Sequence, residues 1–162
     1  FAIGDESIEE IVVNKALEND ISLSIAESCT GGLIGHRITQ ISGSSKIFKG
    51  SVVVYSNSSK VNLLGVGENC ITKHGAVSEE TAKEMAEKVR EMFSTKLGLS
   101  ITGIAGPDGG SKEKPIGLTY IGLSTKKETK VQKFQFGSIR KSNKARASQA
   151  ALNWMRLEIS NV

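Results

Sequence analysis

The chain has 162 residues, of which 38% are hydrophobic and 23% are charged, a composition that predicts one folded domain with its own core. Two cysteines and two histidines are too few for a disulfide scaffold or for a zinc site of four cysteines. The spacing of Cys29 and Cys70, and of His36 and His74, also excludes a zinc site of paired cysteines and paired histidines at the usual local spacing. The net charge of +4 is uneven: residues 112–162 carry 11 basic and three acidic side chains, or +8, so residues 1–111 carry −4. A basic C-terminal third is typical of proteins that attract anions, although solvated helix and strand faces would show the same excess.

The first half of the chain alternates helical and extended patterns. Ser7 with Glu10 is a capping box and predicts a helix over 8–17. A strand over 21–26, a turn over 27–32 and a helix to about residue 41 follow. The β-branched run at 50–56 predicts a buried strand, after which a short helix carries Lys60.

In the second half, Ser78 followed by two glutamates begins a helix that runs to about residue 93. A strand over 97–101 leads into a glycine-rich loop over 102–110. Strands over 116–124 and 130–136 form a hairpin, and a helix over 141–160 ends the chain. This order predicts a three-layer α/β/α fold with a mixed, mostly parallel sheet, in a single domain spanning 1–162. With no apolar run near ~20 residues and no signal peptide, we expect no membrane partner and a cytoplasmic location.

Residues 26–32 join a strand to a helix through Ser28, Cys29, Thr30 and two glycines. Backbone N–H groups at such a junction favour an anion or a developing oxyanion, and a hydroxyl there is a candidate nucleophile. Serine and threonine are also the usual helix caps. Cys29 is an alternative nucleophile, but a thiolate normally needs a nearby histidine. We assign no catalytic role to His36 or to His74, which we expect to lie in a turn.

Three further segments carry candidate functional residues. Tyr55 ends the strand, and Lys60 lies about one helical turn later. If burial lowers its pKa, a lysine at this place can act as the base for a serine. A lysine on the protein surface is the more common interpretation of such a position. The 102–110 loop lacks a phosphate-loop or Rossmann signature, yet it leaves a strand end, where open α/β sheets bind ligands. Arg140 and Lys144 begin the last helix, where cations oppose the helix dipole unless an anion lies between them.

Taken together and in this order, these segments resemble the C-terminal domain of CinA, the competence/damage-inducible protein, whose stand-alone relatives are nicotinamide mononucleotide amidohydrolases. The match extends over about residues 8–158, in stretches at 26–32, 51–60, 75–81, 100–110, 114–117 and 140–152. Residues 1–10 resemble the junction that follows an N-terminal domain in the two-domain proteins. The family more often has an acid before Arg140 and an arginine at position 144, where this chain has Ile139 and Lys144.

The resemblance implies a role for each matching residue. Ser28 corresponds to the nucleophile, Lys60 to its base and Tyr55 to a tyrosine that assists the base. The implied substrate-binding residues are Thr30, Gly31, Gly32, Thr102, Gly103, Gly106, Arg140 and Lys144. No cofactor and no metal ion are expected.

The expected reaction is hydrolysis of the carboxamide of nicotinamide mononucleotide to nicotinate mononucleotide and ammonia. N–H groups near residues 30–32 would stabilise the oxyanion. A domain that senses a nucleotide without turning it over is the alternative, and a nucleic-acid-binding module is a third reading, although no binding motif accompanies the basic segment. We therefore expect a pyridine mononucleotide as ligand, no nucleic acid, a homo-oligomer, and a possible fusion to an N-terminal CinA domain.

Overall fold

The computed structural model describes residues 4–162, so part of the expected junction at residues 1–10 lies outside the described residues. A five-stranded sheet forms the centre, in the order β2 (Phe48–Val53), β1 (Leu23–Glu27), β3 (Leu97–Gly103), β4 (Leu118–Ser124), β5 (Thr129–Gln135). β1 pairs in parallel with β2 and β3, whereas β3–β4 and β4–β5 are antiparallel. Four of the five strands therefore run in one direction and only β4 runs against them.

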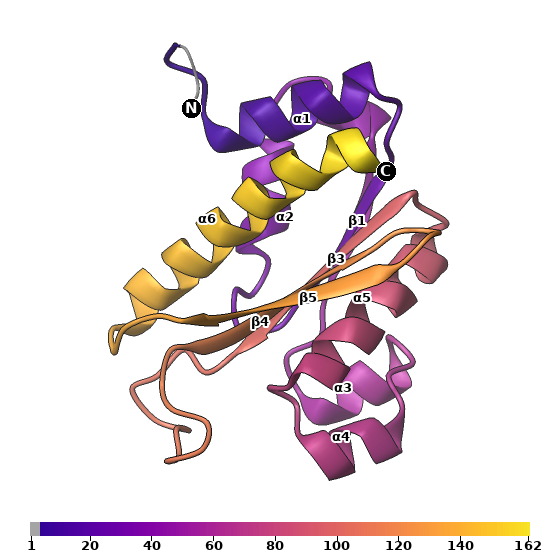
Figure 1. Cartoon of the computed structure of the whole chain (residues 1–162). Coiled ribbons are helices and arrows are strands. Elements are labelled where there is room, and N and C mark those ends of the chain that lie inside the picture. Colours follow the sequence, from indigo (N-terminus) through magenta and orange to yellow (C-terminus); the bar gives the residue numbers. More distant parts are fainter. Residues whose placement is uncertain (1–3) are drawn as a thin grey trace.

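Helices cover both faces of this sheet (Figure 1). On one face lie α1 (Ile8–Glu18), α2 (Leu33–Thr39) and α6 (Arg140–Glu158), with short 3₁₀ turns at Ser44–Lys46 and Ile159–Asn161. Their buried apolar side chains pack on Leu23, Ile25 and Ile101 of the two central strands in the larger of two hydrophobic clusters. The capping box of Ser7 and Glu10 is present at the start of α1.

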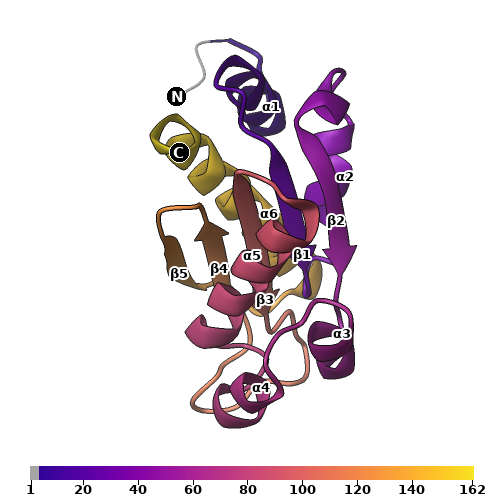
Figure 2. The ribbon, with the colours of Figure 1, turned by 90° about the vertical axis from the view of Figure 1, so that its right-hand side faces the viewer.

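The opposite face carries α5 (Glu79–Phe93), whose N-cap is Ser78. The second cluster joins Met85 and Val89 of α5 to Ala26 of β1 and to apolar residues around α3 (Asn57–Asn62) and α4 (Glu68–His74). Figure 2 shows α3 and α4 at the end of the molecule where the loop after β3 also lies. The expected three-layer α/β/α architecture with a mixed sheet is confirmed.

Two local expectations were wrong. The strand expected over 50–56 as a buried element is β2, which begins at Phe48 and lies at the edge of the sheet with alternating half-buried and exposed residues. Its β-branched run predicted a strand correctly but could not distinguish an edge from a centre. The region around His74, expected to be a turn, is the last turn of the seven-residue helix α4, which is too short for a periodic pattern to reveal.

The register of the parallel strands brings three chain segments together. Glu27, the last residue of β1, lies opposite Val53 of β2 and Ile101 of β3. The residues that follow these strands therefore leave the sheet at the same edge, where open α/β sheets commonly bind ligands. The segments beginning at Ser28, Val54 and Thr102 meet at this edge.

Candidate active site

The central contact of the site joins Ser28 to Lys60. Ser28 follows β1 directly, and its backbone N–H donates to the carbonyl of Ile101 at 3.0 Å, which holds it against β3. Lys60, in the last turn of α3, places its Nζ 3.0 Å from Ser28 Oγ. The two residues are only 7% and 1% exposed, so the contact is shielded from bulk water.

Two carbonyl groups orient the lysine. Lys60 Nζ donates to the backbone oxygens of Val54 at 2.9 Å and Tyr55 at 3.1 Å. Burial lowers the pKa of Lys60 from its ordinary 10.5, because the apolar surroundings disfavour the charged form. Lys60 Nζ thus has three oxygen partners, the two carbonyls and Ser28 Oγ. The carbonyls can only accept, so the proton that Lys60 would exchange lies toward Ser28, the arrangement that a general base for this serine requires.

Cys29, the alternative nucleophile, is also buried in the site. Burial raises the pKa of its thiol to about 12, so the thiolate needed for attack is scarce near neutral pH. Neither histidine lines the pocket: His36 is exposed on α2, and His74 ends α4 with Nδ1 3.4 Å from Glu80. The environment thus favours the serine over the cysteine.

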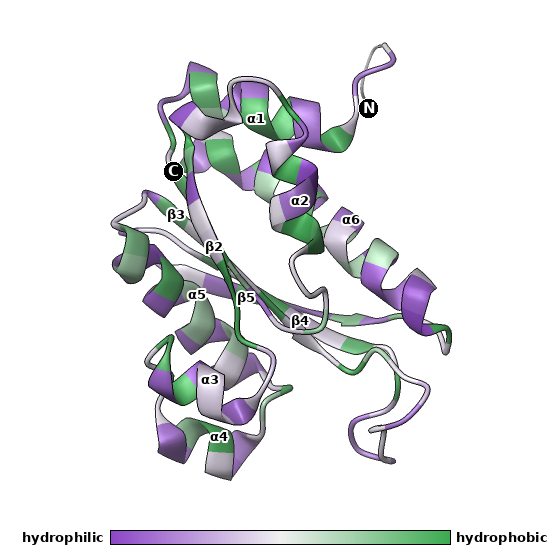
Figure 3. Ribbon diagram, turned by 180° about the vertical axis from the view of Figure 1, so that it is seen from behind, coloured by the Kyte–Doolittle hydropathy of each residue, from purple (hydrophilic) through white to green (hydrophobic). Residues whose placement is uncertain are grey.

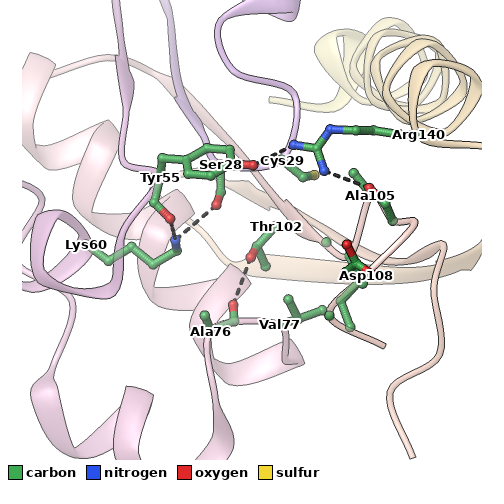
Figure 4. Close-up of a pocket in the computed structure, with 14 residues that line it drawn as sticks. Ser28, Cys29, Tyr55, Lys60, Ala76, Val77, Thr102, Ala105, Asp108 and Arg140 are labelled. Carbon is green, nitrogen blue, oxygen red and sulfur yellow. Dashed lines mark hydrogen bonds between the residues drawn. The ribbon is translucent and has the colours of Figure 1, made fainter. Parts of the chain in front are cut away.

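A pocket opens in front of Ser28 at the carboxyl edge of the sheet (Figure 4). Seven of the predicted site residues line it: Ser28, Tyr55, Lys60, Thr102, Gly103, Gly106 and Arg140. Thr102 is nearly fully buried and its hydroxyl donates to the carbonyl of Ala76 at 2.8 Å, so it ties β3 to the turn before α5. A Cβ at Gly103 would lie 2.6 Å from Thr119 Oγ1 and 3.2 Å from Cys29 Sγ, which leaves no room for a larger residue.

Arg140 closes the side of the pocket opposite Lys60. Its guanidinium donates to the carbonyl of Gly106 at 2.8 Å and to the hydroxyl of Tyr55 at 2.7 Å. Tyr55 is 58% exposed, so its ring lies at the rim while its backbone carbonyl receives Lys60. The phenol was expected to assist the base, but the structure gives its hydroxyl to Arg140 instead.

The remaining four predicted residues, Thr30, Gly31, Gly32 and Lys144, do not line the pocket. The hydroxyl of Thr30 and the N–H of Gly32 both donate to the carboxylate of Glu27, at 2.6 and 3.1 Å, and the N–H of Gly31 donates to the carbonyl of Ser28. The expectation that the amides of residues 31 and 32 are free for an oxyanion was therefore wrong. Lys144 lies beside this turn, with Nζ 3.8 Å from the position of a Cβ on Gly31.

Residues that the sequence analysis passed over complete the site. Ala76, Val77, Ile104, Ala105, Asp108 and Gly109 add to the pocket lining. Of these, Asp108 is the one carboxylate, and its position within the glycine-rich loop was the available signal.

Among residues 4–162, no three histidine, cysteine or acidic side chains gather into a possible metal site, and no helix is both long and apolar enough to span a membrane.

Comparisons with known proteins show the family of the chain. The family model for the CinA C-terminal domain matches residues 5–159. The CinA-like protein of Kosmotoga olearia is 48% identical over 96% of the chain, and a putative competence-damage inducible protein of Thermoanaerobacter sp. strain X514 is 47% identical over 96%. The chain spans 38% of the length of each.

Solved structures show the same architecture. The competence/damage inducible protein CihA from Agrobacterium tumefaciens shares 32% identity, with a TM-score of 0.90 over 99% of both chains. A CinA superfamily protein from Klebsiella pneumoniae, at 23% identity, supports the fold alone, with a TM-score of 0.91 over 97% of this chain and 100% of that one. From its fold, its sequence relatives and the family model, the chain belongs to the CinA C-terminal domain family.

Proposed function

We propose that this domain is an amidohydrolase that converts nicotinamide mononucleotide to nicotinate mononucleotide and ammonia by serine–lysine catalysis. The observation that carries the proposal is the buried 3.0 Å contact between Ser28 Oγ and Lys60 Nζ, in a pocket that also holds a cation, Arg140. A base with a lowered pKa beside a serine hydroxyl supports acyl transfer. The choice of this amide among possible substrates rests on the resemblance described above.

The proposed chemistry follows from the three hydrogen-bond partners of Lys60, which are Ser28 Oγ and the carbonyls of Val54 and Tyr55. Ser28 Oγ attacks the carboxamide carbon as Lys60 takes its proton, so that all three N–H groups of the resulting ammonium have acceptors. Collapse of the tetrahedral intermediate breaks the C–N bond, and Lys60 returns the proton to the departing nitrogen, which leaves as ammonia. Water then attacks the Ser28 ester as Lys60 accepts its proton. Lys60 passes this proton to Ser28 Oγ when the ester C–O bond breaks, which releases the carboxylic acid product and restores the serine.

Of the amides expected to bind the oxyanion, those of Gly31 and Gly32 have protein acceptors, whereas that of Thr30 has none among the described residues. Within residues 4–162, the backbone N–H groups of Cys29 and Thr30 have no protein acceptor. They are the next two amides after the nucleophile, which is where strand–turn–helix nucleophiles commonly find a donor. We assign the oxyanion to these two amides, each of which would lower the barrier by about 3 kcal/mol in a typical oxyanion hole.

The phosphate of the substrate is assigned to Arg140, which reaches across the pocket entrance from the first turn of α6. No acidic residue lies in this first turn, and no side chain caps it. Figure 3 shows the start of α6 as strongly hydrophilic. Lys144, one turn later, would add charge without the bidentate geometry of an arginine. The guanidinium has five N–H donors, so it could bind the phosphate while the Tyr55 hydroxyl and the Gly106 carbonyl hold it in position.

The test is ammonia release from nicotinamide mononucleotide by the 162-residue chain, followed by mass spectrometry of the product. Ser28→Ala should abolish turnover. Ser24→Ala is the matched control, because Ser24 is a buried serine of β1, at the end of the strand away from Ser28. Its hydroxyl contacts Thr95 Oγ1 and the Val89 carbonyl and not the pocket. Tight binding without product would instead support a nucleotide-sensing domain, and full turnover by Ser28→Ala would refute the assigned nucleophile.

Three further expectations stay predictions. A homo-oligomer is tested by light scattering, absence of nucleic-acid binding by titration at low salt, and a cytoplasmic location by fractionation of the source cells. The relatives are longer than this chain, which supports an additional domain in the full-length protein.

A further inference from the structure

A buried carboxylate lies directly behind the nucleophile. Glu27 ends β1, is 0% exposed, and precedes Ser28. Its side chain turns to the face that carries α2 and accepts hydrogen bonds from the backbone N–H groups of Gly32 at 3.1 Å, Ile34 at 3.1 Å and Gly35 at 2.8 Å. The hydroxyl of Thr30 adds a fourth contact at 2.6 Å. One side chain thus spans the whole turn from strand to helix.

The oxygens of Glu27 accept all four of these hydrogen bonds. Backbone N–H groups can only donate, so three of the four contacts need an acceptor. Both carboxylate oxygens are used, Oε2 by Thr30, Gly32 and Ile34, and Oε1 by Gly35. No cation pairs with Glu27 among the ion pairs of residues 4–162. The N-terminal amides of α2 and the Thr30 hydroxyl therefore stabilise the charge by themselves.

The turn folds around this carboxylate and not around an external anion. Gly31 and Gly32 adopt φ of +62° and +103°, conformations in which a larger side chain is strained. These two residues direct the chain back so that the first amides of α2 reach Glu27. Thr30 and Gly32 are thereby bound to Glu27, while the amides of Cys29 and Thr30 have no protein partner in the part of the chain that the structure describes.

We propose that Glu27 is a positioning residue that holds the Ser28 turn, keeping Ser28 Oγ at Lys60 and the amides of Cys29 and Thr30 open to the oxyanion. The inference rests on the proposed serine–lysine function. Glu27 touches neither substrate nor base in this role. It acts through the turn, so its loss would reduce the rate of attack by Ser28 more than the affinity for substrate.

The experiment follows Ser28 with a fluorophosphonate, a probe that needs no natural substrate. Attack by Ser28 Oγ forms an O–P bond, expels fluoride and passes the serine proton to Lys60, and intact-mass analysis gives the labelling rate. Glu27→Gln retains the size of the side chain but presents an amide N–H₂ group to backbone donors. A misplaced nucleophile should slow labelling about 10- to 100-fold. In the ammonia assay, kcat should fall while KM stays within about twofold.

Thr30→Val is the second variant, because it removes one contact to Glu27 and preserves the shape of the turn. It should slow labelling about tenfold, which keeps the test available if Glu27→Gln does not fold. Ser24→Ala distinguishes a displaced Ser28 from a general loss of protein stability. It removes buried hydrogen bonds from the opposite end of β1, so it should lower Tm without changing the labelling rate.

The outcomes are distinct. Slow labelling of Glu27→Gln or Thr30→Val at a Tm no lower than that of Ser24→Ala supports the proposal. If folded Glu27→Gln is labelled at the wild-type rate, the positioning role of Glu27 is overturned and the serine–lysine function is left intact. If Glu27→Gln does not fold, labelling of Thr30→Val at the wild-type rate has the same consequence. A wild-type chain that neither reacts with the probe nor releases ammonia refutes the proposed function, and the positioning role falls with it.

Discussion

Replacing Lys60 by methionine removes the proposed base with little change in side-chain length. Methionine fills the buried space of the lysine stem but offers no nitrogen to Ser28 Oγ, and it leaves the carbonyls of Val54 and Tyr55 without their 2.9 and 3.1 Å donors. Because a positioned general base contributes about 10²- to 10⁴-fold, kcat should fall by about that factor. The corresponding rise in activation free energy is about 3–5 kcal/mol.

The assay measures ammonia release at saturating substrate, and fluorophosphonate labelling at several pH values. Lys96→Met is the matched control: Lys96 also donates to a backbone carbonyl, that of Asp20 at 2.7 Å, but it is an exposed residue. The control should retain activity within about twofold. If Lys60→Met labels and turns over at the wild-type rate while Lys96→Met does the same, Lys60 is not the base and the serine–lysine assignment is wrong.

The other predictions use the same protein and separate the roles of individual groups. Since burial lowers the folded-state pKa of Lys60 below 10.5, the unfolded chain holds a proton that the folded chain lacks between these two values. The free energy of unfolding should therefore rise with pH through that window by up to about 1.4 kcal/mol per pH unit, a slope that denaturant titrations of Lys60→Met should lack. Activity should likewise rise with pH through this lowered pKa. Tyr55→Phe removes only the hydroxyl bound to Arg140, so kinetics should show a KM increase of about two- to fivefold with an unchanged pH profile. Arg140→Gln should raise KM for the mononucleotide by about tenfold or more and leave the phosphate-free nucleoside unaffected; equal effects on both would contradict phosphate binding. Gly98→Ala would place a Cβ 2.5 Å from the carbonyl oxygen of Ala86, and thermal melts should show a loss of about 1–3 kcal/mol.

The fold could be predicted because its strongest signals are local. The capping box before α1, the two glutamates at the start of α5 and the hairpin of β4 and β5 each depend on residues a few positions apart. The edge position of β2 could not be predicted, because exposure depends on which strands pair beside it. Helix α4, at seven residues, is shorter than two helical turns and carries no periodic signal.

The candidate site could be predicted as a set of residues but not as a set of contacts. Lys60 and Ser28 are 32 positions apart, and no local pattern shows that α3 turns its lysine back toward β1. The sequence also could not show that the Tyr55 phenol bonds to Arg140 while its carbonyl binds Lys60. An acidic residue at the end of an apolar strand, four positions before the first of two glycines, was the available signal for Glu27.

Lys60 and Glu27, the two ionisable side chains beside the serine, have different partners, and no carboxylate contacts the lysine among residues 4–162. Lys60 is oriented by the carbonyls of Val54 and Tyr55, which carry no net charge. A carboxylate in their place would raise the pKa of the lysine and hold its proton. Glu27 lies one residue from the nucleophile, but its carboxylate is directed to the amides of α2 and the hydroxyl of Thr30. Because those donors compensate its charge, the site keeps a buried acid as a structural anchor while Lys60 stays able to accept the serine proton.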